Sequence, residues 1–384
     1  METAPQWSEL PIDILGVVFR RLLSFGDHVR ASAVCPQWRA AAVGNPPRLP
    51  LLMVLPTAAP ARITGYVSVS PTCWMWETTA AQLPHLLRLT LPSTSGPAFL
   101  RVFGDDVYRL PRFPDDALRG RFCGSFPGGW VTLALEHYRG HCILNLHTGE
   151  RIDLPDLVCT PSPPIDCITV IKYLTLSSSP TREGTFIVAA VTSGVANIAF
   201  WEPGAERWCP PTLAGLTDEQ LQRWRRNLPR DPIDDILYFR GCLHEGFYVL
   251  NGDETLLVYV PEAGEGSNDK TPKFRVVSYL FQSGTPMTDP GSRVKGRYLV
   301  ETRGNLLMVR HLSSSDGSDQ FEMFVLEGER SVTTGTVHAV WRKCSILTGR
   351  ALFLGHGCSM AVETGITSHV VMYCLSAGEI WVYP

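Results

Sequence analysis

Apolar residues near the start of the chain recur with the period of an α-helix. Between residues 10 and 22 they occupy positions i, i+1, i+4, i+5 and i+8 of one helical face. These residues are Ile14, Leu15, Val18, Phe19 and Leu22. Pro11 suits the first turn of a helix, and Asp13 suits the positive end of the helix dipole. The pattern therefore predicts an amphipathic helix that begins at about Pro11.

Two further short helices are expected before residue 46. The residues Ser24-Phe25-Gly26-Asp27 form a capping-box pattern ahead of a short helix. Pro36 opens a third helix, which the Gly-Asn-Pro-Pro run at 44–47 ends. Three helices in about forty residues rarely enclose a stable core alone. Some of their apolar side chains should therefore stay exposed as a docking surface for a partner.

From Leu49 onward the pattern changes to short apolar runs with a period of two, separated by Gly, Pro, Asp and Ser. An apolar strand that runs into a polar turn recurs five or six times, at intervals of roughly 55 to 66 residues. The anchors of this repeat are Leu146, Trp201, Val260, Leu326 and Val382. Such spacing is typical of four-stranded β-propeller blades with loop insertions. We expect about six blades, with the last strand completing a blade begun near 63–69 or 86–91.

Two segments depart from the strand pattern. A capping box at 217–220, followed by apolar residues at helical spacing, predicts one short helical insertion that ends at Pro229. Residues 155–166 are rich in Pro, Ser and Asp, and we expect them to form a surface loop.

The amino-acid composition argues against several classes of protein, including nucleic-acid-binding, disulfide-linked and membrane-spanning proteins. With 34 Lys and Arg against 37 Asp and Glu, the chain lacks the basic field that favours nucleic acid as a partner. The 11 Cys are odd in number and scattered, which indicates reduced thiols. The start of the chain shows no secretory signal, and the apolar runs are shorter than a membrane helix needs. We therefore expect a soluble protein of the cytoplasm, the nucleus or both, without a nucleic-acid or membrane partner.

The N-terminal motif is similar to a known family. The run Leu10-Pro11-x-Asp13-Ile14-Leu15, followed by Val34-Cys35-x-x-Trp38-Arg39, resembles the F-box in order and spacing. The resemblance implies a helical motif that docks on a Skp-type adaptor and so joins a protein to a cullin-RING ubiquitin ligase. It implies that Phe19, Leu22 and Val29 hold the helices together. The residues that it implies for adaptor binding are Leu10, Pro11, Ile14, Leu15, Val18, Val34, Cys35 and Trp38. An ordinary three-helix cap on the following domain is the alternative.

The rest of the chain also resembles a family. Its motifs include Gly124-Ser125-x-x-Gly128-Gly129-Trp130, Arg297-Tyr298-Leu299-Val300-Glu301 and Arg350-Ala351-Leu352-Phe353-Leu354-Gly355. They are similar to the plant F-box-associated domain of unknown function 295, a KIB-type propeller. The similarity covers roughly residues 90 to 380, so the resemblance implies that most of the chain is one β-propeller.

Motifs of common catalytic sites are missing from the sequence. We find no G-x-S-x-G elbow, P-loop, H-E-x-x-H or EF-hand loop. His141 and His147 lack a Cys or carboxylate at a spacing that would complete a metal site. Some propellers are enzymes whose blades converge on a central channel, and there His147, His244, Asp253, His311 and His356 are conceivable contributors. A buried, hydrogen-bonded histidine is the simpler interpretation.

The sequence thus predicts an α+β multidomain protein: a small three-helix F-box at 6–45, a Pro-rich linker at 46–62 and an all-β propeller at 63–384. We expect a non-catalytic substrate-recognition adaptor of an SCF-type (Skp-cullin-F-box) E3 ubiquitin ligase, without a cofactor or a metal, whose propeller binds an unknown target protein. An F-box scaffold that acts outside a ligase is one alternative. A propeller enzyme with a small-molecule or metal site is another.

Overall fold

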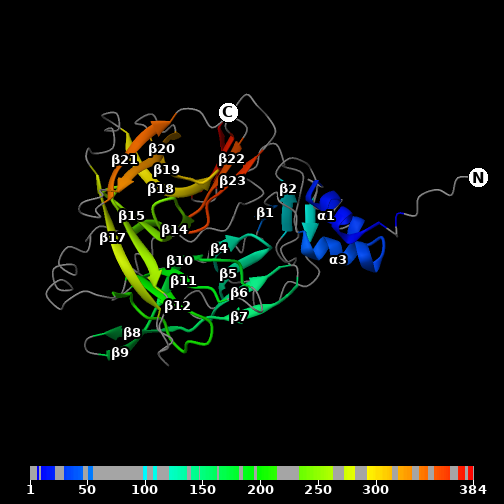
Figure 1. Ribbon diagram of the computed structural model, residues 1–384, viewed down its shortest axis with the longest axis horizontal. Helices are drawn as coiled ribbons and strands as arrows, with labels where there is room; N and C mark the ends of the chain where they lie inside the picture. Colours follow the sequence, from blue (N-terminus) through cyan, green and yellow to red (C-terminus); the bar gives the residue numbers. More distant parts are fainter. Residues whose placement is uncertain are drawn as a thin grey trace, which may run out of the picture.

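The computed structural model has a small helical part and a large β body (Figure 1). The structure describes residues 7, 10–21, 30–45, 51–54, 98–101, 107–109, 121–135, 140–146, 148–161, 164–180, 185–193, 197–213, 233–262, 272–281, 292–313, 319–330, 337–344, 350–363, 371–376 and 379–383. Several predicted features lie outside these residues: the capping box at 24–27, the helix at 217–229, the segments 63–69 and 86–91, and His147. None of the described helices is long and apolar enough to cross a bilayer.

Two helices of the N-terminal part pack against each other. Helix α1 (Ile12–Arg21) begins directly after Pro11, and α3 (Pro36–Gly44) begins with proline, as the sequence predicts. Residues 30–32 are also helical. Leu15 and Phe19 of α1 are buried against two alanines of α3. The Phe19 ring also meets the Trp38 ring edge-on, at 5.9 Å between centroids.

The β body consists of several sheets in chain order. The first holds β1 (Leu51–Val54), β2 (Ala98–Arg101) and β3 (Val107–Arg109), and the second holds β4 (Arg121–Phe126), β5 (Trp130–Ala134), β6 (His141–Asn145) and β7 (Arg151–Asp153). A hairpin of β8 (Leu157–Pro161) and β9 (Pro164–Ile168) follows, and then β10 (Val170–Leu176), β11 (Val188–Ser193) and β12 (Ile198–Trp201).

The next two groups of strands are joined into one nine-stranded sheet. One group is β14 (Ile233–Arg240), β15 (Glu245–Asn251), β16 (Leu256–Glu262) and β17 (Lys273–Phe281), with β13 (Thr212–Leu213) beside β17. The other is β18 (Arg293–Thr302), β19 (Asn305–Ser313), β20 (Asp319–Arg330) and β21 (Val337–Cys344). Parallel pairing of β17 with β21 joins them. The last sheet holds β22 (Arg350–Leu354), β23 (Met360–Glu363), β24 (Val371–Ser376) and β25 (Glu379–Tyr383).

First strands of successive groups lie next to one another. Strand β4 contacts β10, β10 contacts β14, β14 contacts β18, and β18 contacts β22. In the groups that begin with β4, β10, β14 and β18, the later strands run outward from this series, which is the arrangement of blades in a propeller. In the last sheet β23 is an edge strand and also lies beside β18, and β24 and β25 follow on the other side of β22. The mainly β body of the prediction is thus confirmed, whereas the number of blades stays a prediction. Among the described residues, β25 pairs with β24, and the segments expected to close the ring with it are not described.

Neighbouring sheets share their cores, which explains the long apolar runs. Strand β15 reads Phe247-Tyr248-Val249-Leu250, and all four residues are buried. Phe247 and Val249 pack into a core with residues of β10, β11 and β12, whereas Tyr248 and Leu250 pack into a core with residues of β18 to β21. A strand with a packed sheet on each face has no solvent side, so its sequence is apolar at consecutive positions.

Two segments differ from the prediction. Residues 155–166, expected to be a loop, include β8 and most of β9, because Val158 is buried in a core and pairs with Trp208. Residues 51–54 of the expected linker form β1, which pairs with β2. In both places tertiary contacts prevail over a proline-rich local composition.

Candidate functional site

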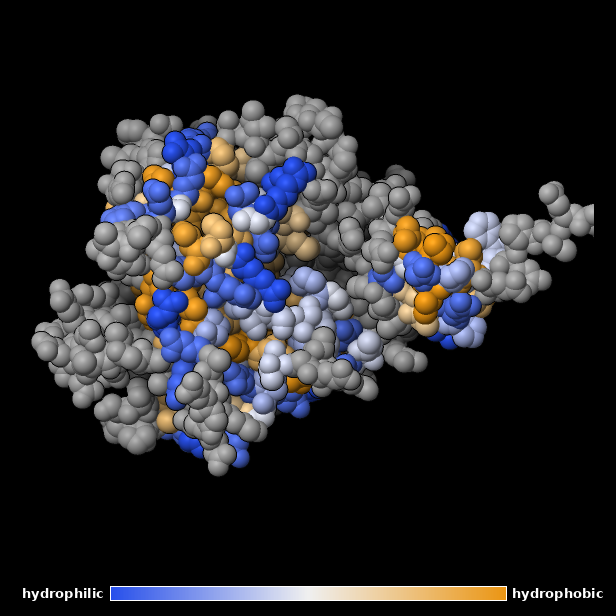
Figure 2. All heavy atoms as spheres, viewed as in Figure 1, coloured by the Kyte–Doolittle hydropathy of each residue, from blue (hydrophilic) through white to orange (hydrophobic). Residues whose placement is uncertain are grey.

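Exposed apolar side chains gather on the helical part of the chain. Ile14 is 46% exposed and Val34 is 58% exposed, and Pro11 is also exposed. Figure 2 shows hydrophobic side chains at the surface over this part of the molecule. Because exposed aliphatic groups cost free energy in water, such a cluster is typical of a surface that a partner covers. These three are the predicted adaptor-binding residues that lie at the surface.

The other predicted adaptor-binding residues lie deeper. Leu10 and Trp38 pack on the small core between the helices, and Val18 and Cys35 are half-buried. The Trp38 indole Nε1 donates a hydrogen bond to the Trp7 carbonyl at 3.0 Å, and the Gln37 side chain donates one to the Leu10 carbonyl at 2.9 Å. These bonds hold the segment before α1 against α3.

Leu15 is a different case, because its side chain is completely buried between α1 and α3. The apolar pattern placed it on the same face of the helix as Ile14 and Val18, and the F-box resemblance implied that it contacts the adaptor. In this structure it shapes the surface from inside and has no exposed area to offer a partner.

Sequence reasoning missed three exposed apolar residues. Trp7, Ile12 and Val17 are 40% exposed or more but were not among the predicted contacts. For the two residues inside α1, the available signal was their position on the helical wheel: Val17 falls about 60° from Ile14, and Ile12 falls about 160° away on the other side. Val17 therefore extends the exposed patch, whereas Ile12 lies apart from it.

The residues considered for a propeller enzyme are dispersed in the structure. The His244 ring bonds to the Tyr279 hydroxyl at 3.1 Å, Asp253 accepts bonds from the backbone and side chain of Thr255, and His311 stacks on Phe321. Among the described residues, no group of three His, Cys, Asp or Glu side chains is placed to hold a metal ion. His141 bonds to Asp156 at 3.2 Å instead.

A buried acid joins β14 to β18 and to the turn between β22 and β23. Asp235 of β14 is 0% exposed, and its carboxyl accepts three hydrogen bonds from backbone N–H groups. The donors are Ile236 at 2.9 Å, Leu299 of β18 at 2.7 Å and Gly357 at 2.6 Å. Burial dominates over these bonds and raises the pKa of Asp235 to about 8. The protonated acid therefore prevails at neutral pH.

His356 lies beside this acid, with its Nδ1 4.0 Å from the Asp235 carboxyl. Its ring stacks between Tyr173 of β10 and Tyr298 of β18, at 5.1 and 4.7 Å between centroids. Burial lowers the pKa of His356 to about 4, so the ring is neutral at physiological pH. A neutral acid and a neutral imidazole bind the β22–β23 turn to three other groups of strands. Sequence reasoning considered His356 but not Asp235. The sign of Asp235 in the sequence was an acidic residue inside an otherwise apolar strand.

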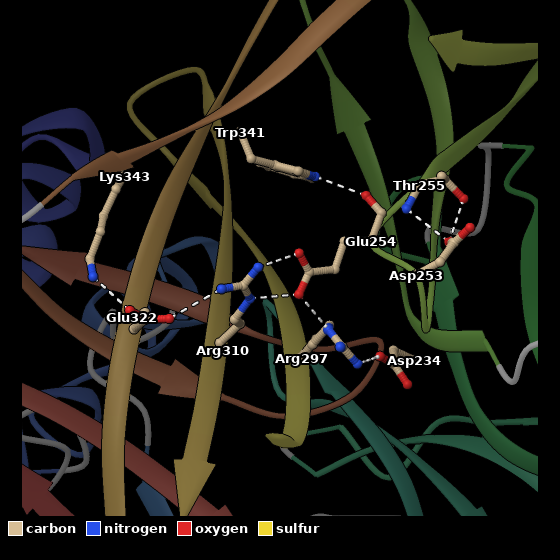
Figure 3. Close-up of polar contacts among 9 residues, drawn as sticks. All are labelled: Asp234, Asp253, Glu254, Thr255, Arg297, Arg310, Glu322, Trp341 and Lys343. Carbon is tan, nitrogen blue, oxygen red and sulfur yellow. Dashed lines mark hydrogen bonds and ion pairs between the residues drawn. The ribbon is translucent and has the colours of Figure 1, made fainter. Parts of the chain in front are cut away.

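A buried ion network connects the β14–β17 and β18–β21 groups (Figure 3). Glu254, in the turn between β15 and β16, accepts hydrogen bonds from Arg310 of β19 and Arg297 of β18, and its carbonyl accepts one from the Trp341 indole. Arg297 also bonds to Asp234 at 2.7 Å. Arg310 continues the network to Glu322, which pairs with Lys343 on its other side. These ion pairs connect residues of β14, β18, β19, β20 and β21 with the turn between β15 and β16.

Comparison with known proteins gives two family matches. The chain matches the F-box domain over residues 7–48 and the KIB1-4 beta-propeller over residues 99–374. No curated protein matches it. The major allergen Mala s 1 of Malassezia sympodialis shares 9% identity at a TM-score of 0.23, over 68% of this chain and 85% of the other. The PQQ-bound aldose sugar dehydrogenase of Streptomyces coelicolor shares 10% identity at a TM-score of 0.21, over 68% and 87%. Scores this low carry no argument about function.

The matched residues agree with the geometry. The F-box match spans the two helices and their exposed apolar surface, and the propeller match spans the strands from β2 to most of β24. Domains of these two kinds are typical of non-catalytic adaptor proteins. With the match extending over well more than half of its length, the chain belongs to the KIB1-4 beta-propeller family, and it carries an F-box domain before the propeller.

Proposed function

We propose that this chain is a substrate-recognition subunit of an SCF-type E3 ubiquitin ligase. Its F-box docks on a Skp-type adaptor, and its propeller binds a target protein. The observation that carries the proposal is the exposure of the apolar side chains of Ile14 and Val34, both of which lie inside the F-box match. Burying such side chains against a partner contributes about 25 cal/mol for each Å² covered.

The predicted contact residues take different parts in this proposal. Pro11, Ile14 and Val34 contact the adaptor directly, and Val17 extends their patch. Leu10, Val18, Cys35 and Trp38 are half-buried and border it. Leu15 supports the patch from within.

The proposed mechanism is an increase in effective concentration. A target held by the propeller meets the charged conjugating enzyme of the assembly far more often than it would by diffusion. The chain itself then needs no catalytic residue, because other subunits perform the transfer of ubiquitin. The cullin partner, a cytoplasmic or nuclear location and a plant origin are parts of the same proposal.

The test is co-purification of the full chain with a Skp-type adaptor after co-expression. We expect the double variant Ile14→Asp with Val34→Asp to weaken adaptor binding at least tenfold, because each carboxylate would have to lose its water in the interface. Both residues are exposed, so the variant should fold. Ile12→Asp is the control for added charge, because it places one carboxylate on another side of α1.

The outcomes separate the alternatives. Adaptor binding that survives the double variant, or that Ile12→Asp weakens equally, overturns the assignment of this surface. A complex with the adaptor that never contains a cullin favours a scaffold that acts outside a ligase.

A further inference from the structure

Two cysteines lie side by side where the β8–β9 hairpin joins the body of the protein. Cys159 belongs to β8, and Cys209 belongs to the segment that follows β12. The Cys159 N–H donates to the Trp208 carbonyl at 3.0 Å, and the Trp208 N–H donates to the Leu157 carbonyl at 2.8 Å. These two bonds form a parallel bridge between Val158 and Trp208. One residue further along each of the two parallel segments, Cys159 therefore lies opposite Cys209.

The two thiols point to the same face of this sheet. Val158 and Trp208 are buried in a core with residues of β10, β11 and β12. Successive side chains of an extended chain point to opposite faces, so Cys159 and Cys209 both point to the outer face. Both cysteines are half-buried there, so a small reagent can reach them.

An ion pair independently shows which side chains share this outer face. Arg207 reaches Asp166, with Nη1 2.8 and 3.0 Å from the two carboxylate oxygens. Asp166 is the cross-strand partner of Cys159. The pKa of the Arg207 guanidinium is raised, first by the Asp166 carboxylate and also by a hydrogen bond with the Cys159 side chain. The Arg207 side chain thus crosses β8 at Cys159, and Cys209, two residues after Arg207, points to the same face.

The backbone holds the two cysteines at the separation that a disulfide needs. Neighbouring strands lie about 4.7–4.9 Å apart, and the Cα atoms of disulfide-bonded cysteines are usually about 4.4–6.8 Å apart. The Cys209 N–H donates to the Phe200 carbonyl at 2.9 Å, and the Phe200 N–H donates to the Cys209 carbonyl at 2.7 Å. Strand β12 therefore fixes Cys209 from one side, and pairing with β9 fixes Cys159 from the other.

A third cysteine of the hairpin points the other way. Cys167 of β9 is the cross-strand partner of Val158 and packs on the same inner core. Its thiol is therefore separated from Cys159 and Cys209 by the sheet itself. This difference gives a matched comparison within one hairpin.

We propose that Cys159 and Cys209 form a reversible redox site, which a peroxide converts into a disulfide. The thiolate of one cysteine attacks hydrogen peroxide and breaks its O–O bond, which gives a sulfenic acid and, after uptake of a proton, one water. The thiol of the other cysteine then displaces the sulfenic oxygen as a second water, and the S–S bond forms. Two thiols and one peroxide thus give one disulfide and two waters. A dithiol reductant reverses the step by thiol–disulfide exchange and is itself oxidised to a disulfide.

The disulfide would fasten the hairpin to the body of the protein. In the reduced chain, the two backbone bonds with Trp208 join β8 to the body, and the Trp208 indole Nε1 donates to the Pro155 carbonyl at 2.7 Å. A covalent bond between Cys159 and Cys209 would keep β8 beside this segment even when those hydrogen bonds open. The inference goes beyond the proposed function and does not depend on it.

The test treats the folded full chain with hydrogen peroxide, blocks the remaining thiols with iodoacetamide and maps cross-linked peptides by mass spectrometry. We expect the Cys159–Cys209 cross-link to be at least tenfold more abundant than any cross-link to Cys167, or to Cys242, which is exposed in the turn between β14 and β15. Dithiothreitol should remove the cross-link. The oxidised chain should unfold at a higher urea concentration than the reduced chain.

Two serine variants separate the pair from its neighbour. Cys209→Ser should abolish the cross-link and the shift in the urea midpoint, and it should leave Cys159 as a sulfenic acid that dimedone labels. Cys167→Ser, the same substitution on the other face of the hairpin, should preserve both the cross-link and the shift. Phenylarsine oxide bridges two adjacent thiols, so in the unaltered reduced chain it should protect Cys159 and Cys209 together from alkylation, a measurement that requires no variant.

Several results would overturn the redox site. One is a folded chain that yields no Cys159–Cys209 cross-link, and another is a cross-link that forms equally well in urea, where the sheet no longer holds the two residues together. Loss of the cross-link in Cys167→Ser, or failure of phenylarsine oxide to protect both thiols, would refute the predicted pairing. Identical urea midpoints for the oxidised and reduced chains would refute the fastening of the hairpin.

Discussion

The Gly357 backbone N–H donates a 2.6 Å hydrogen bond to the Asp235 carboxyl, and this bond joins two residues that lie 122 positions apart. It fixes the turn between β22 and β23 against β14. The same carboxyl holds Leu299 of β18, so one side chain determines how three groups of strands meet.

Asp235 should make stability depend on pH in an unusual direction. Its pKa is raised from 3.8 to about 8 in the folded chain, so between these values the folded state binds the proton and the unfolded state does not. Stability from this group is therefore fully present at low pH and is lost as pH rises towards 8. Between pH 6.5 and 8 we expect urea unfolding to show a loss of at most about 1.4 kcal/mol per pH unit that Asp235→Asn abolishes. Equal slopes for the two proteins would contradict the buried acid.

His356 should contribute with the opposite sign. Its pKa falls from 6.5 to about 4 on folding, so its stability contribution is present above pH 6.5 and is lost as pH falls towards 4. We expect His356→Phe, which keeps an aromatic ring between Tyr173 and Tyr298, to lose less stability than the unaltered chain from pH 6.5 to 4.5. The measurement is the urea midpoint at each pH, and an identical loss in both proteins would count against this assignment.

Removing one member of the buried ion network should be costly. We expect Glu254→Gln to destabilise the protein by about 3 kcal/mol, because Arg310 and Arg297 would lose their shared carboxylate. Glu327→Gln is the control: Glu327 pairs with Arg342 at 2.7 Å, but both side chains are exposed, so its loss should cost clearly less than the loss of Glu254. Chemical denaturation measures both variants, and similar losses would show that the network is not special.

Gly357 should tolerate a methyl group poorly. Its φ is +73°, and a Cβ there would collide with the Leu174 backbone oxygen. Gly304 has nearly the same φ, +74°, with no atom within 4 Å of such a Cβ. We expect Gly304→Ala to cost about 1–2 kcal/mol for the backbone conformation alone, and Gly357→Ala to cost clearly more. Matching costs in thermal unfolding would mean that the close approach contributes nothing.

Local sequence patterns predicted the helices and strands better than they predicted the contacts between these elements. The helical period predicted α1, and the repeated apolar strands anchored at Trp201 and Val260 correspond to β12 and β16, because burial of that kind leaves a direct mark on the sequence. The β8–β9 hairpin was missed because Pro161 and Pro164 favour a loop by composition, while the contact that makes β8 a strand comes from Trp208, far along the chain.

For the candidate sites, too, the sequence predicted local features better than contacts between distant residues. Helical spacing placed Ile14, Leu15 and Val18 on one face of α1, but it could not show that α3 covers Leu15 and leaves Ile14 exposed. Asp235 drew no attention in the sequence, because its role depends on donors that arrive from β18 and the β22–β23 turn.

Parallel pairing of β17 with β21 has a consequence for how the molecule comes apart. Three consecutive residue pairs, from Tyr279–Val337 to Phe281–Ala339, connect the outer strands of two neighbouring groups by main-chain hydrogen bonds. These two groups therefore cannot separate until the ladder between β17 and β21 breaks. This half of the propeller should melt as a single cooperative block.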